Sequence, residues 1–200
     1  YRCKIKITPA ALIPRPETEI LVDHIVKKLS GQDLSGKVLW DICTGSGCIG
    51  IALKKTFPCL KVVLSDLSPE ALSLAHENAQ QNKVEVEFRL GDLLAPFSGE
   101  KADFVTCNPP YISEEEYGRL QPSVAHFEPK MALVGGKSGL EFYQKLALEL
   151  PHMFNEKGKA FFEIGALQGE EVRKIFAETK NISVEKDWAG LDRFFFLEKQ

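Results

Sequence analysis

Residues 38–50 read VLWDICTGSGCIG and carry the strongest structural signal in the chain. Val38–Ile42 is an apolar run with the length of a buried strand, and the glycine-rich turn after it opens a helix that we expect to reach Lys55. A second apolar run, Leu60–Ser65, ends at Asp66. A strand, a glycine-rich turn, a helix and a second strand in this order predict two parallel strands joined by a crossover helix.

The rest of the chain continues this alternation. Further helices are predicted over residues 17–29, 69–82, 140–154 and 170–180, and further strands over residues 84–88, 102–107, 159–164, 182–188 and 193–198. The last two strands flank the short turn Ala189–Asp192, which is typical of a hairpin. The sequence therefore predicts an α/β fold, a doubly wound and mainly parallel seven-stranded sheet whose terminal hairpin supplies one antiparallel strand. Residues 111–137 are expected to be irregular.

The composition is that of a globular domain. Of 200 residues, 44% are apolar and 26% are charged, and the net charge is −3. These values exclude wholesale disorder and argue against a general nucleic-acid binder, which needs a basic face. We expect a single domain over residues 1–200, in which residues 1–36 form a leading segment with the first helix and residues 37–200 form the sheet core. A monomer is the expected state.

The sequence also bears on the cellular compartment. No uncharged apolar run approaches the roughly 18 residues of a membrane helix, and the first residues do not form a signal peptide. The five cysteines are odd in number and include no Cys-x-x-Cys pair, and the four histidines are scattered. This pattern favours a reduced, cytoplasmic protein with neither a disulfide framework nor a metal site.

Three segments with chemically versatile side chains follow strands of the predicted sheet. They are residues 41–50 after the first strand, residues 91–93 after the third and residues 108–111 after the fourth. In doubly wound sheets, ligands bind beyond the carboxyl ends of the strands, where the strand order reverses. The convergence of the three segments at this edge predicts a ligand site.

The first segment has the pattern of a nucleotide-binding turn. Gly45, Gly47 and Gly50 form a Gly-x-Gly-x-x-Gly motif, and Asp66 lies about 20 residues beyond it, where it is expected to accept hydrogen bonds from both hydroxyls of a ribose. The Asp41 carboxylate would repel a pyrophosphate but attract a ligand with an amino group and a sulfonium. The segment therefore favours S-adenosylmethionine over NAD, although similar turns also occur without a ligand.

The second segment is Gly91-Asp92-Leu93. Asp92 is expected to accept a hydrogen bond from the exocyclic amine of adenine, while Leu93 packs on the ring. The alternative is an ordinary Gly-Asp turn.

The third segment, Asn108-Pro109-Pro110-Tyr111, ends the fourth strand abruptly. Two consecutive prolines fix the backbone and remove two N–H donors, which leaves carbonyl groups free as acceptors. Asn108 adds a side-chain oxygen, and Tyr111 adds a flat aromatic face. Together they predict a site for a planar group that bears NH₂, with both hydrogens bound by acceptors and the plane stacked on the ring.

These motifs resemble those of a known family. The Asn-Pro-Pro-Tyr motif and the Asp-x-x-Thr-Gly-Ser-Gly turn are similar to those of class I S-adenosylmethionine-dependent amino methyltransferases. Residues 12–19, LIPRPETE, are similar to the hallmark of bacterial HemK-type peptide-chain-release-factor glutamine methyltransferases. Further similar positions are Glu128, Pro129, Ala132, Leu133, Gly139, Leu140, Tyr143, Glu163, Ile164, Gly165, Gln168, Asp192 and Arg193. The resemblance covers essentially the whole chain.

The resemblance implies a Rossmann-like fold and methylation of the side-chain amide of the glutamine in the Gly-Gly-Gln motif of class I release factors. S-adenosyl-L-methionine would be the cofactor and S-adenosyl-L-homocysteine the product, with no metal. The implied catalytic residues are Asn108, Pro109 and Tyr111, and Pro110 joins them in substrate binding. The implied cofactor-binding residues are Asp41, Ile42, Cys43, Thr44, Gly45, Gly47, Asp66, Asp92, Leu93 and Asn108.

The sequence departs from this family at two points. The family usually has an amino-terminal helical domain that docks the release factor, so we expect this chain to be the catalytic portion. It also usually has tryptophan where Leu93 stands, which predicts a thinner platform for adenine.

Other functions remain open at this point. A methyltransferase acting on exocyclic amines of adenine or guanine in nucleic acids uses the same motif, but the glutamates at residues 114–116 would repel a phosphate backbone. An NAD-dependent oxidoreductase and a catalytically silent binding module are further alternatives. For five residues, the sequence does not decide between a role in the ligand site and a role in helix capping or loop structure. They are Arg15, Glu17, Thr18, Glu163 and Gln168.

Overall fold

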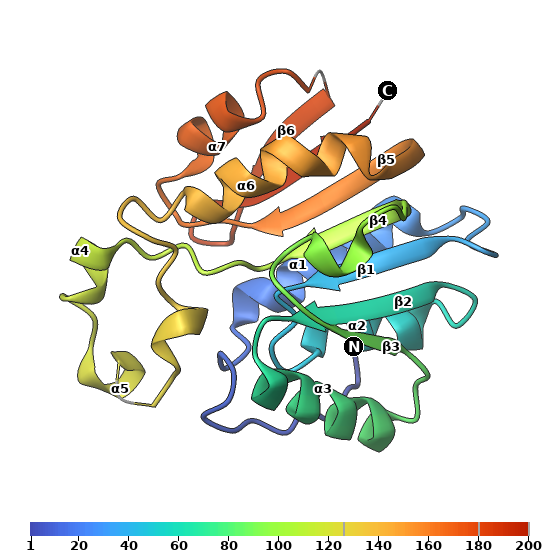
Figure 1. Cartoon of the computed structure of the whole chain (residues 1–200), viewed down its shortest axis with the longest axis horizontal. Coiled ribbons are helices and arrows are strands. Elements are labelled where there is room, and N and C mark those ends of the chain that lie inside the picture. The colour runs from blue at the N-terminus through green and yellow to red at the C-terminus, as the bar shows by residue number, and fades with distance from the viewer. Residues whose placement is uncertain (126, 180, 200) are drawn as a thin grey trace.

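The computed structural model describes residues 1–125, 127–179 and 181–199. In this part of the chain, seven strands form one sheet in the order β3-β2-β1-β4-β5-β7-β6 (Figure 1). The first five strands pair in parallel, and β7 runs antiparallel to both of its neighbours, as predicted. The strands are β1 (Val38–Ile42), β2 (Lys61–Asp66), β3 (Glu87–Leu90), β4 (Ala102–Cys107), β5 (Phe154–Glu163), β6 (Asn181–Lys186) and β7 (Asp192–Glu198).

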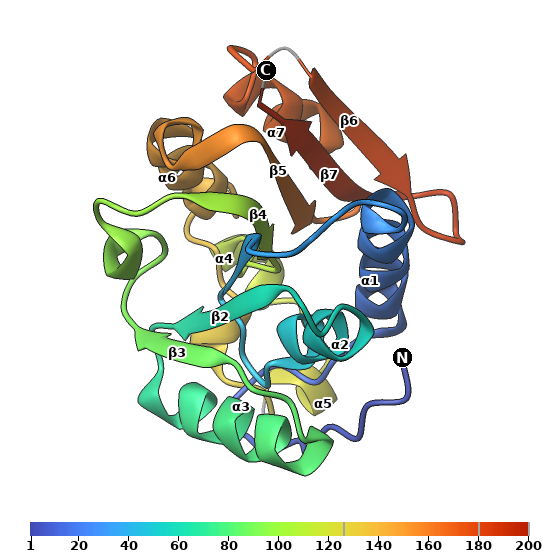
Figure 2. The ribbon, with the colours of Figure 1, turned by 90° about the vertical axis from the view of Figure 1, so that its right-hand side faces the viewer.

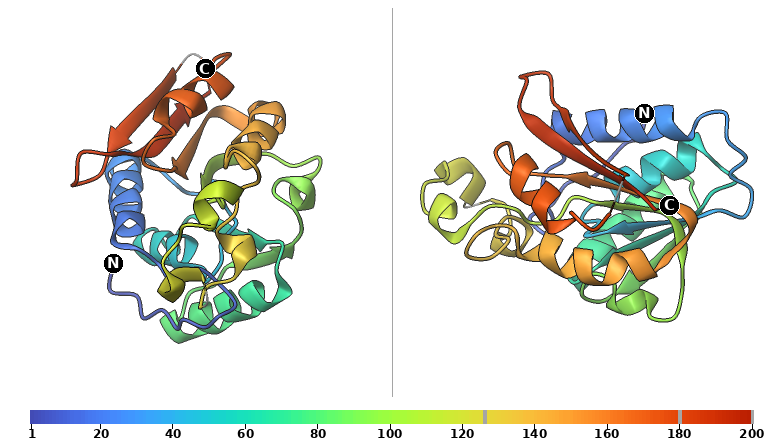
Figure 3. Two further views of the ribbon diagram at one scale, coloured as in Figure 1. Left: turned by 90° about the vertical axis from the view of Figure 1, so that its left-hand side faces the viewer. Right: turned by 90° about the horizontal axis from the view of Figure 1, so that it is seen from above.

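Helices cover both faces of the sheet (Figures 2 and 3). Those that form one apolar layer with it are α1 (Pro16–Leu29), α2 (Cys48–Thr56) and α3 (Pro69–Asn82). Those that form the opposite layer are α6 (Glu141–Glu149) and α7 (Gly169–Ile175). Within the described residues, no helix combines the length and the apolar character needed to cross a membrane.

Local sequence explains where two of these helices begin. Pro16 is in the first turn of α1, where its missing N–H costs nothing and its fixed φ suits a helix. The Ser68 hydroxyl accepts a hydrogen bond from the Ala71 N–H at 3.1 Å and caps α3, with Pro69 at its first position. Both starts agree with the predicted boundaries.

The third strand begins at Glu87 and not at Val84 as predicted. Lys83 ends α3 in the left-handed conformation, with φ of 57°, and the Val84 N–H donates to the Ala79 carbonyl at 3.1 Å. These contacts keep the chain at the end of α3. Pairing with β2 therefore starts only at Glu87, which lies opposite Val63.

The helix predicted over residues 140–154 is also shorter in the structure. Pro151 has no N–H to donate and its ring clashes with the preceding turn, so α6 ends at Glu149 and a 3₁₀ turn follows. Strand β5 takes up the chain at Phe154, five residues before the predicted start.

The helix predicted over residues 170–180 ends early, at Ile175. The chain turns directly after it, with the Thr179 N–H donating to the carbonyl of the buried Phe176 at 2.9 Å. Residue 180 lies outside the described part of the chain.

The segment between residues 111 and 137 lies beyond the carboxyl ends of β1, β2 and β4, on the left of Figure 1. It was expected to be irregular, but it contains the short helices α4 (Glu114–Tyr117) and α5 (Pro122–Ala125) and a parallel bridge between Ile112 and Val134. The strand order reverses between β1 and β4, so this edge is the switch point at which doubly wound sheets bind ligands.

Candidate functional site

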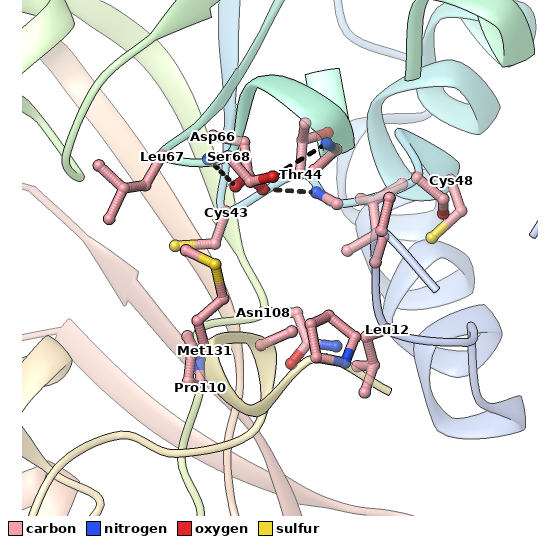
Figure 4. A pocket seen from close by; sticks show the side chains of 18 of the residues that line it. Leu12, Cys43, Thr44, Cys48, Asp66, Leu67, Ser68, Asn108, Pro110 and Met131 are labelled. Carbon is pink, nitrogen blue, oxygen red and sulfur yellow. Dashed lines mark hydrogen bonds between the residues drawn. The ribbon is translucent and has the colours of Figure 1, made fainter. Parts of the chain in front are cut away.

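A pocket of about 890 Å³, measured with its open mouth, lies at this edge of the sheet (Figure 4). In Figure 4, Thr44, Asp66 and Ser68 stand on one side of the open space, and Leu12, Asn108 and Pro110 stand on the other. The pocket thus has two walls built on different strands. We call the side formed by residues 43–49, 66–71 and 91–93 the cofactor wall, and the side of Asn108 and Pro110, which belong to the turn of residues 108–111, the acceptor wall, after the roles that the sequence predicts for them.

The glycine-rich turn of the cofactor wall needs its unusual backbone. Cys43, Gly45 and Gly47 all have positive φ values, of 55°, 55° and 80°. The φ of 80° at Gly47 favours glycine, and a Cβ there would lie 2.9 Å from the end of the Ile51 side chain and 3.1 Å from the Ala75 Cβ. Cys43 takes the left-handed conformation although it is not glycine, which places a strained residue in the pocket wall.

Asp41 lies behind this turn and not in the pocket. Its side chain is fully buried, and one carboxylate oxygen accepts hydrogen bonds from the Thr44 hydroxyl at 2.5 Å and the Gly50 N–H at 3.0 Å. The other oxygen has no partner among the described residues. Burial raises the pKa of Asp41 to about 7. The structure therefore gives Asp41 the role of holding the turn, in place of the expected direct contact with a ligand.

Other predicted residues are likewise set behind the pocket surface. The side chains of Ile42 and Pro109 are buried and, like Gly47, are not part of the lining, so Pro109 can contribute to the site only through its backbone. The predicted residues that do line the pocket are Cys43, Thr44, Gly45, Asp66, Asp92, Leu93, Asn108 and Pro110.

The Asp66 carboxylate is fixed at the end of β2 by backbone donors. It accepts hydrogen bonds from the Gly45 N–H at 2.8 Å and from the Ser68 N–H at 3.0 Å, one on each oxygen. Burial raises the pKa of Asp66, and these two donors oppose the shift. A carboxylate has about four lone-pair positions, so two remain for a ligand in the pocket.

The turn after β3 contributes the rim of the cofactor wall. A Cβ on Gly91 would lie 2.5 Å from the Pro96 ring, so this close approach needs glycine. Leu93 is buried with φ of 45°, and Asp92 is exposed beside the Lys145 ammonium, 3.4 Å away. An apolar surface with a carboxylate at its edge therefore faces the pocket.

The acceptor wall leaves one amide free. No described residue is hydrogen-bonded to the Asn108 side chain, which lines the pocket. Tyr111 is half-buried outside the lining, and its hydroxyl donates to Glu163 at 3.3 Å. Burial and the nearby Glu163 carboxylate raise the pKa of Tyr111 above its ordinary value. Tyr111, the predicted stacking surface, is therefore not part of the pocket lining in this structure.

The pocket also has a roof that the motifs did not predict. It consists of residues 10–14 and 129–132, two segments far apart in the sequence. The buried Glu128 carboxylate joins them, because it forms an ion pair with Arg15 and accepts a hydrogen bond from the Ile13 N–H at 3.1 Å. Glu128 and Arg15 are in the family-like motifs, but nothing in their spacing indicates that they pair.

The residues with open roles take defined places. Arg15 joins the roof, and Glu17 lies in the first turn of α1. The Thr18 hydroxyl donates to the Glu163 carboxylate at 2.8 Å, and Gln168 donates to the Tyr111 carbonyl at 2.9 Å. Thus Thr18, Glu163 and Gln168 connect α1 and the loop after β5 to the acceptor wall.

The charge of the lining is one-sided. Among the described residues that line the pocket, Asp66 and Asp92 are carboxylates and none is lysine, arginine or histidine. Such a surface attracts a cationic ligand and repels a pyrophosphate. In the same described residues, no cluster of three or more histidine, cysteine, aspartate or glutamate side chains has the arrangement of a metal site.

Comparisons with known proteins agree with this geometry. A family model described as "Methyltransferase small domain" matches residues 16–125. A release factor glutamine methyltransferase of Chlamydia trachomatis serovar L2 is 48% identical over 199 residues, which cover 98% of this chain and 68% of that protein.

Solved structures give the same fold. A release-factor-specific protein-(glutamine-N5) methyltransferase of Alicyclobacillus acidocaldarius aligns with a TM-score of 0.60 and 26% identity over 98% of this chain and 99% of that one. An RNA methyltransferase of Salinibacter ruber in complex with S-adenosyl-L-homocysteine aligns with a TM-score of 0.56 and 22% identity over 93% of each chain. At this identity, the second likeness shows the fold alone.

Proposed function

The chain belongs to the release factor glutamine methyltransferase family, and we propose that it methylates the side-chain amide nitrogen of the glutamine in the Gly-Gly-Gln motif of class I release factors, with S-adenosyl-L-methionine as methyl donor. One observation carries the proposal: the Asn108 side-chain amide, to which no described residue is hydrogen-bonded and which two prolines follow, lines an acidic pocket at the switch point of the sheet. We further propose that it acts as a monomer in the cytoplasm, where release factors act.

The pocket has the hydrogen-bond acceptors and the charges that this cofactor requires. Asp66 keeps two lone-pair positions for the ribose hydroxyls, and Asp92 lies beside the apolar surface of Leu93 for adenine. The Cys43–Gly45 turn leaves room for the amino-acid end of the ligand. The acidic lining favours a ligand with a sulfonium over a dinucleotide. The cofactor supplies an electrophilic methyl group bonded to its sulfonium sulfur.

An amide nitrogen is a weak nucleophile because its lone pair is delocalised into the carbonyl. The acceptor wall can compensate for this by orienting the amide. We assign to the Asn108 side-chain oxygen and the Pro109 carbonyl the role of accepting hydrogen bonds from the two N–H groups of the glutamine. Acceptors on both hydrogens turn the lone pair toward the methyl group, and well-oriented reactants can lower a barrier by about 7–11 kcal/mol. Transfer would form the N–C bond as the methyl–sulfur bond breaks, with S-adenosyl-L-homocysteine as the leaving group, and the nitrogen would then lose one proton to solvent.

The alternative of a nucleic-acid methyltransferase is not favoured. The three glutamates of α4 are exposed next to the acceptor wall, where they would repel a phosphate backbone.

Transfer of a labelled methyl group tests the proposed function. The purified chain, S-adenosyl-L-methionine with a radioactive methyl group and a class I release factor are expected to give a labelled release factor. A release factor with alanine in place of the motif glutamine is the matched control and is expected to stay unlabelled. Labelling of both release factors, or of DNA or RNA in place of either, would contradict the proposal.

A further inference from the structure

Tyr111 is fixed at both of its ends, although it does not line the pocket. Its hydroxyl donates to a carboxylate oxygen of Glu163 at 3.3 Å, and its backbone carbonyl accepts a hydrogen bond from the Gln168 amide nitrogen at 2.9 Å. The residue directly before it, Pro110, lines the pocket. The side chains that hold Tyr111 therefore act next to the acceptor wall without contacting a ligand.

Gln168 joins three backbone segments. Its side-chain oxygen accepts from the Gly165 N–H at 2.9 Å, while its amide nitrogen donates to the carbonyls of Tyr111 and Gly139, at 2.9 Å and 3.3 Å. Gly139 has φ of 78°, and a Cβ there would lie 2.3 Å from the Tyr111 carbonyl oxygen. The three segments are thus in close contact, with the glutamine amide satisfied by them.

Glu163 joins the acceptor wall to the first helix. It is 1% exposed, and its two carboxylate oxygens accept from the Tyr111 hydroxyl and from the Thr18 hydroxyl, the latter at 2.8 Å. Burial raises the pKa of Glu163, and the Thr18 hydrogen bond and the charge of Arg193 oppose that shift. Thr18 itself lines the pocket. One buried carboxylate therefore contacts both Tyr111, next to the acceptor wall, and Thr18, which lines the pocket.

We infer that Glu163 and Gln168 are positioning residues for methyl transfer, which hold Tyr111 and, through it, the Asn108–Pro110 turn in the geometry that presents the amide. This inference rests on the proposed function. The physical link is the pair of prolines, whose fixed φ angles leave few rotations between Tyr111 and Asn108. A shift of Tyr111 is therefore passed on to Asn108, and a misplacement of about 1 Å can lower a rate about a hundredfold.

The first test is Gln168→Glu. This variant keeps the length of the side chain and the acceptor for Gly165, but it replaces the donor with an oxygen that faces two carbonyl groups. We expect the single-turnover rate of methyl transfer to fall about a hundredfold, with the dissociation constant for S-adenosylmethionine within about twofold of wild type. Gln144→Glu, the same change at an exposed position of α6, is the matched control and should leave both values unchanged.

The second test is a double-mutant cycle between Glu163→Leu and Tyr111→Phe. Glu163→Leu should lower the transfer rate in the wild-type background. If Glu163 acts through the Tyr111 hydroxyl, the same change should lower the rate much less in the Tyr111→Phe background. Glu163→Gln keeps an acceptor oxygen and should restore most of the rate. Glu171→Leu, on the exposed face of α7, controls for the substitution itself.

Hydrogen exchange of the backbone amides of residues 111–114 gives a readout that does not depend on activity. It should speed up in Gln168→Glu and stay as in wild type in Gln144→Glu. The inference is overturned if Gln168→Glu keeps both the wild-type transfer rate and the wild-type hydrogen exchange. It is also overturned if the fold-losses in rate of Glu163→Leu and Tyr111→Phe simply multiply in the double variant. A wild-type chain that labels no release factor would instead contradict the proposed function, and the exchange data would then report only on whether Gln168 holds residues 111–114 in place.

Discussion

The two walls of the pocket are built in different ways. Two hydrogen bonds that hold the glycine-rich turn of the cofactor wall join residues close in sequence, with 3 residues from Asp41 to Thr44 and 21 from Gly45 to Asp66. The acceptor wall is held from far along the chain, with 52 residues from Tyr111 to its partner at Glu163 and 57 to its partner at Gln168.

Because of this difference, substitutions in the two walls should affect different measurable quantities. The cofactor wall is a local motif, so a change in it should alter cofactor affinity while leaving the acceptor wall in place. The acceptor wall is a product of tertiary packing, so a change in its supports should alter the rate of transfer while leaving cofactor affinity intact. Four predictions test this contrast.

The largest effect is expected at Asn108, on the acceptor wall. Asn108→Ala removes the proposed side-chain acceptor and leaves an amide hydrogen unpaired, so the single-turnover rate should fall about a hundredfold or more. Asn108→Asp keeps an acceptor oxygen, so its single-turnover rate should lie between those of wild type and Asn108→Ala. Calorimetric titration should give all three proteins similar affinity for S-adenosylmethionine. Wild-type transfer by the alanine variant would exclude Asn108 as the amide clamp.

Asp66, on the cofactor wall, should show the opposite pattern. Asp66→Ala loses charge-assisted hydrogen bonds worth about 1.5–3 kcal/mol, so the dissociation constant for S-adenosylmethionine should rise roughly ten- to a hundredfold. Because Asp66 also accepts from the Gly45 and Ser68 N–H groups, the variant should melt at a lower temperature than wild type as well.

A matched control for Asp66 is available outside the pocket. Asp33 accepts a hydrogen bond from the N–H two residues ahead, Ser35, at 3.0 Å, as Asp66 does from Ser68. Asp33→Ala therefore removes a similar turn contact and should leave cofactor affinity unchanged. Equal losses of affinity in the two variants would show that turn stability, and not a contact with the ribose, explains the result.

A third prediction concerns the backbone packing of the acceptor wall. A Cβ on Gly135 would lie 2.3 Å from the Pro110 carbonyl oxygen, so Gly135→Ala should shift the turn and destabilise the fold by about 1–3 kcal/mol. Gly118→Ala places its Cβ no closer than 3.4 Å to the nearest backbone oxygen and serves as the control. Chemical denaturation compares the stabilities, and normal stability together with normal transfer in Gly135→Ala would contradict the close packing.

The last prediction concerns Asp41 and appears as a pH dependence. Burial raises the pKa of Asp41 from 3.8 to about 7, so between these values the folded protein binds more protons at this site than the unfolded chain. The contribution of Asp41 to stability therefore falls as the pH rises through this range. In Asp41→Asn this contribution is absent. The free energy of unfolding of wild type minus that of the variant should decrease from pH 4.5 to 7.5, and a flat difference would refute the shift.

The sequence predicted most of the fold and the cofactor wall because their signals are local. The apolar run Val38–Ile42, the glycines after it and Asp66 are recognisable without knowledge of any distant contact. The errors are local too. The left-handed Lys83 delays β3, and Pro151 ends α6 before the predicted boundary.

The rest of the site was less predictable because its contacts are tertiary. Nothing near Glu128 in the sequence indicates that its carboxylate pairs with Arg15, and nothing near Glu163 indicates a bond to Thr18, 145 residues away. Asp41 and Tyr111 were recognised as important, yet side-chain direction, which decides whether a residue faces a pocket, is fixed by packing that a motif does not record.

The roof has a consequence for synthesis on the ribosome. The carboxylate that holds residues 10–14, Glu128, is made 113 residues after Arg15. The backbone of Lys4 and Lys6 pairs with Asn82 and Asn78, which are made well before Glu128. The leading segment can therefore dock on α3 first, and the roof of the pocket is completed only after residues 128–132 have been translated.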